Sequence, residues 1–253
     1  MVCNSPKPAP VRINPKVPIT MPNKTIWVLF PIEVRNSLDP SGVPVTGNNR
    51  PKNPTKVIIG AAIKTHPVSK RNDISDFERT VRGYFKADPQ RVEAIRNELK
   101  LEGKTVIGIS WKSFKTKYKT KSIELRDMER IFSGLDVVLV NLQYGDVDEE
   151  IREFKKETGI DVVQCASVDN REDLDGLAAL IEMCDLVVST SNVTIHLAGA
   201  IGKETWVLLP YVANFWWPID RTDSIWYPSL KLYRQKKSGD WDSITLDLRK
   251  DFN

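Results

Sequence analysis

The sequence predicts an α/β fold, a doubly wound parallel sheet preceded by a short irregular N-terminal region. From about residue 100, short apolar runs alternate with amphipathic stretches of helical length. The runs are rich in Val, Ile and Leu and lack polar alternation, which is typical of strands buried on both faces. Strands that alternate with helices in this way build parallel sheets with helices on both faces.

Each element follows from a local pattern. The apolar runs predict strands over 105–111, 137–142, 161–163, 186–189 and 205–209. The stretches around them predict helices over 73–84, 88–100, 123–132, 146–158, 172–183, 194–201 and 240–252. Asp88 followed by Pro89 is a typical helix start, because an aspartate caps the first turn and proline fits its first position.

The N-terminal region differs in composition, since twelve of the sixteen prolines lie between Pro6 and Pro67. We expect residues 1–24 to be extended or disordered. Apolar runs at 26–30 and 57–59 could form strands, but turn-forming residues separate them. We therefore divide the chain into a proline-rich segment, 1–72, and an α/β domain, 73–253.

Composition excludes several classes of function. A net charge of +4 over 253 residues is too weak to predict a nucleic-acid partner. Three cysteines without a CxxC pair, and two histidines, argue against a zinc site. We find no signal-peptide core and no apolar run of the ~18 residues that a membrane span needs. We therefore expect a cytoplasmic protein without a bound metal or a membrane span.

The candidate site lies where the predicted strands end, since ligands of open parallel sheets bind beyond the carboxyl ends of the strands. The strongest segment runs from Ser189 to His196, where a buried strand turns into a helix. Amides at a helix start and the positive end of its dipole attract phosphate. We expect Ser191, Asn192, Thr194 and His196 to contact a diphosphate, although one of them must cap the helix and His196 could be structural.

Other strand ends add further candidates. Lys112 and Ser113 could hold a phosphate, or Lys112 could be one solvated lysine of a basic loop. Gln143 and Tyr144 could frame a base or a ribose, whereas Asp146 is better explained as a helix cap. Asp169 fits a ligand contact and a cap equally well.

The C-terminal third holds five of the seven tryptophans. We expect Trp206 and Trp241 to pack against the domain, because each ring buries a large apolar area. Trp216 and Trp217 could pack in the same way or stack on a ligand.

Taken in order, these motifs resemble those of one family. Segments 107–113, 142–146, 168–170, 173–181, 184–189, 191–192, 196–200, 226–229 and 239–241 resemble the C-terminal domain of bacterial glycosyltransferase-like proteins. Those proteins are often fused to tetratricopeptide repeats and are similar to heptosyltransferases and O-linked N-acetylglucosamine transferases. The resemblance covers about residues 80–250 and implies one half of a GT-B fold, with two facing Rossmann-like domains.

The resemblance also implies a function. The C-terminal domain of the family binds the nucleotide-sugar donor, so Lys112, Gln143, Ser191, Asn192, Thr194 and His196 would hold it. Fewer than 80 residues precede the matching part, so we expect a vestigial N-terminal domain and assign no general base. The expected activity is an inverting hexosyl or heptosyl transfer without a cofactor. The alternatives are a non-catalytic domain that binds a nucleotide or a protein, and a half-enzyme completed by a homodimer or a partner chain.

Overall fold

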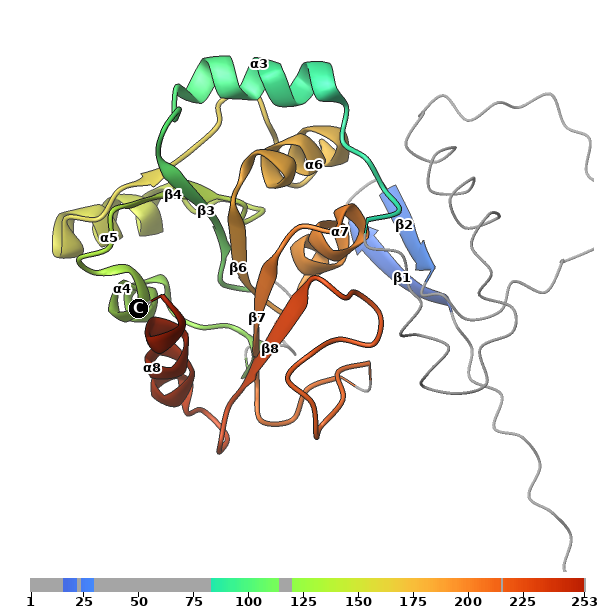
Figure 1. Ribbon diagram of the computed structural model, residues 1–253, viewed down its shortest axis with the longest axis vertical. Helices are drawn as coiled ribbons and strands as arrows, with labels where there is room; N and C mark the ends of the chain where they lie inside the picture. The colour runs from blue at the N-terminus through green and yellow to red at the C-terminus, as the bar shows by residue number, and fades with distance from the viewer. Residues whose placement is uncertain (1–15, 22–23, 30–82, 114–119, 215, 253) are drawn as a thin grey trace, which may run out of the picture.

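The computed structural model describes residues 16–21, 24–29, 83–113, 120–214 and 216–252, the first two ranges by backbone alone (Figure 1). Near the N-terminus, β1 (Lys16–Met21) and β2 (Lys24–Leu29) form an antiparallel pair in which Lys16 lies opposite Leu29. β2 occupies most of the apolar run at 26–30. The boundary predicted between 72 and 73, the run at 57–59 and residues 73–82 of the first predicted helix lie outside the described residues.

The main sheet confirms the predicted fold class. Its strands are β3 (Thr105–Ser110), β4 (Val137–Asn141), β5 (Val162–Val163), β6 (Leu186–Thr190), β7 (Thr205–Leu209) and β8 (Leu230–Arg234). They lie in the order β5-β4-β3-β6-β7-β8, and every neighbouring pair is parallel. The direction of winding reverses between β3 and β6, which makes this the topological switch point of the sheet.

The sequence does not predict β8. Lys231 interrupts its apolar residues and Arg234 ends it, so no continuous buried run marks the strand. The strand lies at the edge of the sheet, where Lys231 is exposed and its ammonium bonds Asp251 at 2.8 Å. An edge strand tolerates such charges because part of it stays in contact with water.

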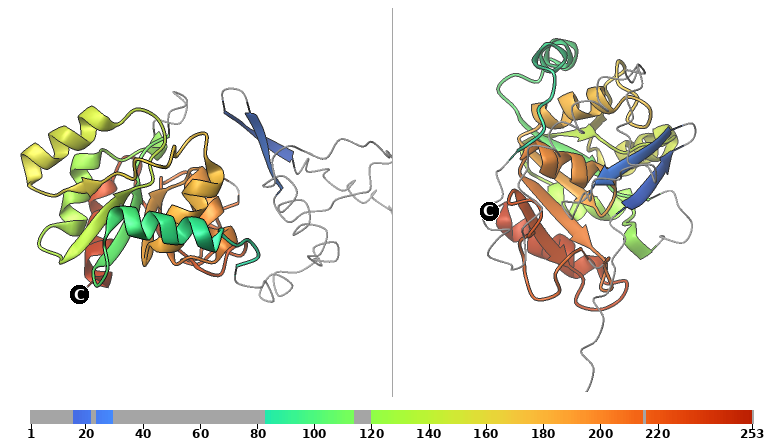
Figure 2. Two further views of the ribbon diagram at one scale, coloured as in Figure 1. Left: turned by 90° about the horizontal axis from the view of Figure 1, so that it is seen from above. Right: turned by 90° about the vertical axis from the view of Figure 1, so that its right-hand side faces the viewer.

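Helices cover both faces of the sheet (Figures 1 and 2). One layer holds α4 (Leu125–Phe132), α5 (Asp148–Thr158) and α8 (Trp241–Asp251). The other holds α3 (Pro89–Leu99), α6 (Leu174–Met183) and α7 (Val193–Ile201). Along β3, Ile107 and Ile109 belong to the first core and Val106 to the second, which explains the unbroken apolar run.

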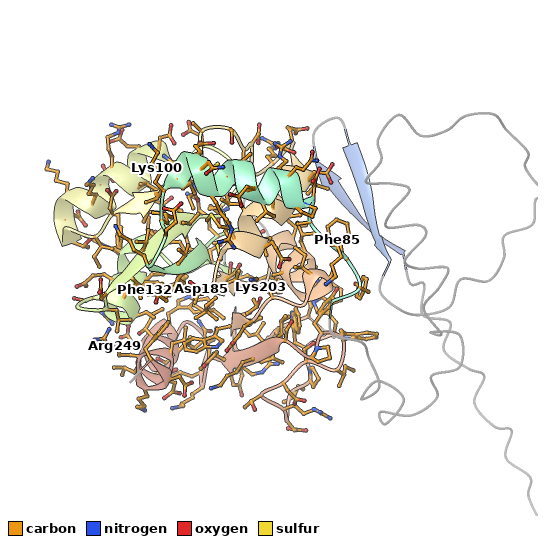
Figure 3. All side chains as sticks on the ribbon, turned by 45° about the horizontal axis from the view of Figure 1, so that its top comes forward. Phe85, Lys100, Phe132, Asp185, Lys203 and Arg249 are labelled. Carbon is orange, nitrogen blue, oxygen red and sulfur yellow. The ribbon has the colours of Figure 1, made fainter. Side chains whose placement is uncertain are left out.

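Side-chain contacts hold α8 against its neighbours; Figure 3 labels Arg249 of α8 and Phe132 of α4. A guanidinium nitrogen of Arg249 in α8 donates to the carbonyl of Ile131 in α4 at 2.9 Å. The packing predicted for Trp206 and Trp241 is confirmed: Trp206 is buried, with its ring centroid 4.6 Å from that of Phe252, and Trp241 packs against the same core.

Local caps decide where the helices begin. Asp88 caps α3 as predicted, because its Oδ1 accepts the amide of Gln90 at 2.9 Å. α6 begins later than predicted, since its cap is Asp173, whose Oδ1 accepts the amide of Gly176 at 2.9 Å. Asp146 does not hold the cap position of α5, which is Val147, but its Oδ1 accepts the amide of Asp148, the first residue of α5, at 3.4 Å.

A short segment ahead of α3 is attached to the end of α7. The amides of Tyr84 and Phe85 both donate to the carbonyl of Ala200 at 2.9 Å. Gly83 has a φ of +72° and lies against the carbonyl of Ile201, where a Cβ would collide. Residues 83 and 84 are therefore not helical, which corrects the end of the helix predicted over 73–84.

Candidate functional site

The candidate site lies at the carboxyl ends of β3 and β6, at the switch point. Ser110 and Ser189 are paired in register there, and both are fully buried. Two hydroxyls side by side in an apolar sheet are costly unless they are hydrogen-bonded. Oγ of Ser189 donates to the carbonyl of Thr190 at 3.0 Å, and the partners of Ser110 come from the turn after β6 and from the residues that follow β4.

Asn192 joins β6 and α7 to β3. Its backbone is extended, and its Oδ1 accepts the amide of Thr194 at 3.0 Å, which makes it the cap of α7. Its Nδ2 donates to Oγ of Ser110 at 2.7 Å. An asparagine can make both contacts because its short side chain carries an acceptor and a donor. Beyond the capped amide, a helix start has further N–H groups directed along its axis.

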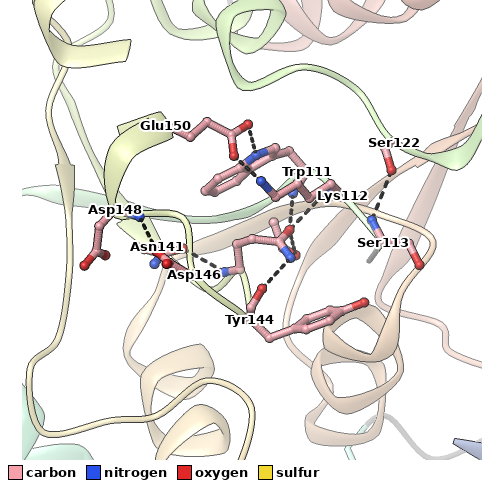
Figure 4. A network of polar contacts seen from close by, with 11 residues as sticks. Trp111, Lys112, Ser113, Ser122, Asn141, Tyr144, Asp146, Asp148 and Glu150 are labelled. Carbon is pink, nitrogen blue, oxygen red and sulfur yellow. Dashed lines mark hydrogen bonds and ion pairs between the residues drawn. The ribbon is translucent and has the colours of Figure 1, made fainter. Parts of the chain in front are cut away.

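Gln143 joins β4 to the same point, and Figure 4 labels Trp111, Lys112 and Tyr144, whose backbone groups this side chain contacts. Its Oε1 accepts from Oγ of Ser110 at 3.0 Å, from the amide of Trp111 at 3.0 Å and from the amide of Lys112 at 2.9 Å. Its Nε2 donates to the carbonyl of Tyr144 at 3.1 Å. The residue is 1% exposed, and its side-chain amide fixes the loop after β3. The contact with a base or a ribose expected for Gln143 stays a prediction.

Lys112 points to α5. Its ammonium pairs with the carboxylate of Glu150, and the indole Nε1 of the buried Trp111 donates to the same carboxylate at 2.8 Å. The neighbouring amide of Ser113 donates to Oγ of Ser122 at 3.1 Å. The sequence does not predict Glu150 as a site residue. The helix dipole favours an acid in the first turn of any helix, so its presence there does not indicate a site.

An aromatic cluster lies against Ser191, just ahead of α7, and against His196 in α7. The indole Nε1 of Trp217 donates to Oγ of Ser191 at 2.9 Å. The imidazole of His196 stacks on Trp217 with ring centroids 5.7 Å apart, and the hydroxyl of Tyr227 lies 3.4 Å from its Nδ1. Burial lowers the pKa of His196 from 6.5 to about 4, so the ring is neutral at pH 7.

Two predicted residues lie beside this network. Oδ1 of Asp169 is exposed and accepts the amides of Arg171 at 2.8 Å and Glu172 at 3.1 Å, so it stabilises a turn ahead of α6. Tyr144 is half-buried and contributes its carbonyl to Gln143. The neighbour of Asp169, Asn170, reaches the site, because its Nδ2 donates to the carbonyl of Gln143 at 3.2 Å.

Two buried hydroxyls lie near the start of α7. Oγ1 of Thr190, the last residue of β6, and Oγ1 of Thr194 have no hydrogen-bond partner among the described residues. Thr194 is a predicted site residue, whereas Thr190 is not, because its place at the end of the buried run suggests a strand residue only. A buried hydroxyl without a partner is costly, and such groups are often found at functional sites.

Neither a metal site nor a membrane-spanning helix occurs in the part of the chain that the structure describes. No group of three or more His, Cys, Asp or Glu side chains is placed there to hold a metal ion. None of the helices described combines the length and the apolar character required to cross a bilayer.

The strand order and the polar switch point together define a Rossmann-like α/β domain. No protein-family model matches the chain. Among curated proteins, it is similar to the protein FlbA of Caulobacter vibrioides, with 35% identity over 162 residues. The match covers 63% of this chain and 27% of FlbA, so the chain spans about a quarter of that relative.

Some solved structures are also similar. They include the E. coli ADP-heptose LPS heptosyltransferase II, with 12% identity, a TM-score of 0.45 and coverage of 64% of this chain and 53% of that one. E. coli heptosyltransferase WaaC with ADP-2-deoxy-2-fluoro heptose has 13% identity and a TM-score of 0.46, over 69% and 49%. A glycosyl transferase of family 9 from Veillonella parvula has 13% identity and a TM-score of 0.46, over 68% and 47%.

Proposed function

We propose that this chain is a glycosyltransferase-like protein whose switch point binds the diphosphate of a nucleotide-sugar. The observation that carries the proposal is the chain of hydrogen bonds from Asn192 through Ser110 to Gln143. It brings the start of α7 and the ends of β3 and β4 to one place. The resemblance of the sequence motifs to glycosyltransferase-like proteins supports the choice of ligand.

Each group has a role in this proposal. The first-turn amides of α7 and the positive end of its dipole would take the phosphate charge. The ammonium of Lys112 would offset further charge, so the proposal needs no metal ion or cofactor. His196, neutral at pH 7, would hydrogen-bond a phosphate or a sugar hydroxyl without adding charge. Gln143 would act by fixing the loop that carries Lys112.

The proposed reaction is an inverting displacement at the sugar carbon. The acceptor hydroxyl forms the new bond to that carbon, and the bond to the diphosphate oxygen breaks. Negative charge then grows on the departing nucleoside diphosphate, where the amides at α7 would stabilise it. The acceptor site and a base to take the hydroxyl proton would come from other parts of the protein, from a second copy of this chain or from a partner chain.

Calorimetric titration of the intact chain with ADP, UDP, GDP and their sugar conjugates tests the proposal. We expect one nucleoside diphosphate to bind and to raise the melting temperature, since a ligand at 100 times its Kd adds about 2.7 kcal/mol of stability. EDTA should leave this binding unchanged. If none of these compounds binds to the folded chain, the proposal is wrong.

A matched pair of variants assigns the binding to α7. Asn192→Ala removes the cap of α7, and Asp88→Ala removes the equivalent cap of α3, which is exposed and lies outside the network. We expect Asn192→Ala to weaken nucleotide binding at least tenfold and Asp88→Ala to leave it unchanged. Titrations are run at a temperature where circular dichroism shows both variants folded. Equal affinities of the two variants would contradict a site at α7.

A further inference from the structure

The carboxylate of Glu150 pairs with the ammonium of Lys112, the group to which the proposed function gives a role in phosphate binding. The residue lies in the first turn of α5, and its carboxylate contacts Lys112 Nζ and Trp111 Nε1 (Figure 4). The side chains of Lys112 and Glu150 are each 26% exposed, so solvent screens the pair only in part.

The carboxylate is fixed independently of Lys112. Trp111 is fully buried, and its indole N–H, 2.8 Å from Oε1 of Glu150, needs an acceptor there. The start of α5 also favours a negative charge at this position. The ammonium of Lys112 sits on a flexible stem, with its Nζ 6.0 Å from the centroid of the Trp111 ring. The pair therefore joins a fixed anion to a cation that can move.

We propose that Glu150 competes with the bound diphosphate for Lys112. This inference rests on the proposed function, because it requires an anionic ligand that uses Lys112. When the diphosphate arrives, Lys112 leaves the carboxylate, and when the nucleotide departs, Glu150 takes the ammonium back. The carboxylate thereby lowers affinity for the nucleoside diphosphate product and speeds its release, a step that often limits turnover.

Glu150→Gln isolates the charge of this carboxylate. Glutamine keeps an oxygen acceptor for the indole of Trp111 but no longer holds the ammonium as a counter-ion. Glu149→Gln is the matched control, because Glu149 lies in the same turn and pairs with Arg152 on the exposed surface. We expect Glu150→Gln to bind ADP, UDP or GDP about five- to tenfold more tightly than the unaltered chain. Glu149→Gln should stay within about twofold.

A double-mutant cycle with Lys112→Met separates competition from simple repulsion. Methionine keeps most of the length of the lysine side chain without its charge. If Glu150 acts by holding Lys112, Glu150→Gln has no effect on nucleotide affinity in the Lys112→Met chain. An equal gain in both backgrounds would show that the carboxylate only repels the ligand, and this would overturn the inference.

The remaining outcomes separate the competition for Lys112 from the proposed nucleotide binding on which it depends. Unchanged or weaker binding by Glu150→Gln, in a chain that binds nucleotide, overturns the competition and leaves the proposed function standing. Failure of every variant to bind any of the three nucleotides overturns both. Binding by the unaltered chain that becomes tighter in Glu150→Gln, with no such gain in the Lys112→Met background, supports both.

Discussion

Replacing Gln143 by alanine should destabilise the domain far more than an ordinary polar substitution. The Oε1 of Gln143 accepts from Ser110 Oγ, from the Trp111 amide and from the Lys112 amide. The first two donors are buried, and alanine would leave both without an acceptor. A buried donor that loses its partner costs about 1–3 kcal/mol. The expected loss for the two donors is therefore about 2–6 kcal/mol, a large part of the stability of a typical domain.

Urea unfolding followed by circular dichroism measures this loss. The matched control is Gln164→Ala, since Gln164 also makes two side-chain hydrogen bonds, to Asn141 at 3.1 Å and to Asp148 at 3.2 Å, but is exposed. We expect the control to cost less than about 1 kcal/mol, because water replaces its partners. If the two substitutions lower the free energy of unfolding equally, the buried hydrogen bonds of Gln143 do not stabilise the domain more than the exposed ones of Gln164.

Two further predictions concern stability. Burial lowers the pKa of His196 from 6.5 to about 4, so as the pH falls through this window the unfolded chain binds the proton first. The unaltered chain should lose up to about 3 kcal/mol of unfolding free energy there that His196→Phe does not lose, and equal pH slopes in urea titrations would contradict this. In Gly108→Ala, the new Cβ would meet Leu142 Cδ1 and, at 2.9 Å, Cys184 Sγ. We expect a cost of about 1–3 kcal/mol, seen as a lower melting temperature, and an unchanged value would mean that the core yields at this point.

The fold could be predicted from the sequence because burial on both faces leaves a clear signal. Every residue of β6 and β7 is buried, so both strands appear in the sequence as nearly continuous apolar runs. Asp88 and Pro89 mark the start of α3 by local chemistry alone. β8 leaves a weaker signal, since an edge strand can carry Lys231 and Arg234. The choice between Asp169 and Asp173 as the cap of α6 depends on chain geometry that spacing does not fix.

The candidate site could be predicted in part. The ends of apolar runs locate Lys112, Gln143 and Asn192, and the structure brings these three to the switch point. Their contacts with a ligand stay predictions. The partners of these residues could not be foreseen, because Ser110 and Glu150 lie far along the chain from the groups that they bond. Only the order of strands brings such residues together.

The attachment of Gly83, Tyr84 and Phe85 to α7 has a practical consequence for anyone who shortens this protein. The carbonyl of Ala200 receives two amides from that segment, and only glycine fits at its first position. A fragment that starts at Pro89, where α3 begins, would strip both donors from the end of the helix whose beginning bears Asn192. Fragments meant for crystallisation or screening should therefore retain Gly83.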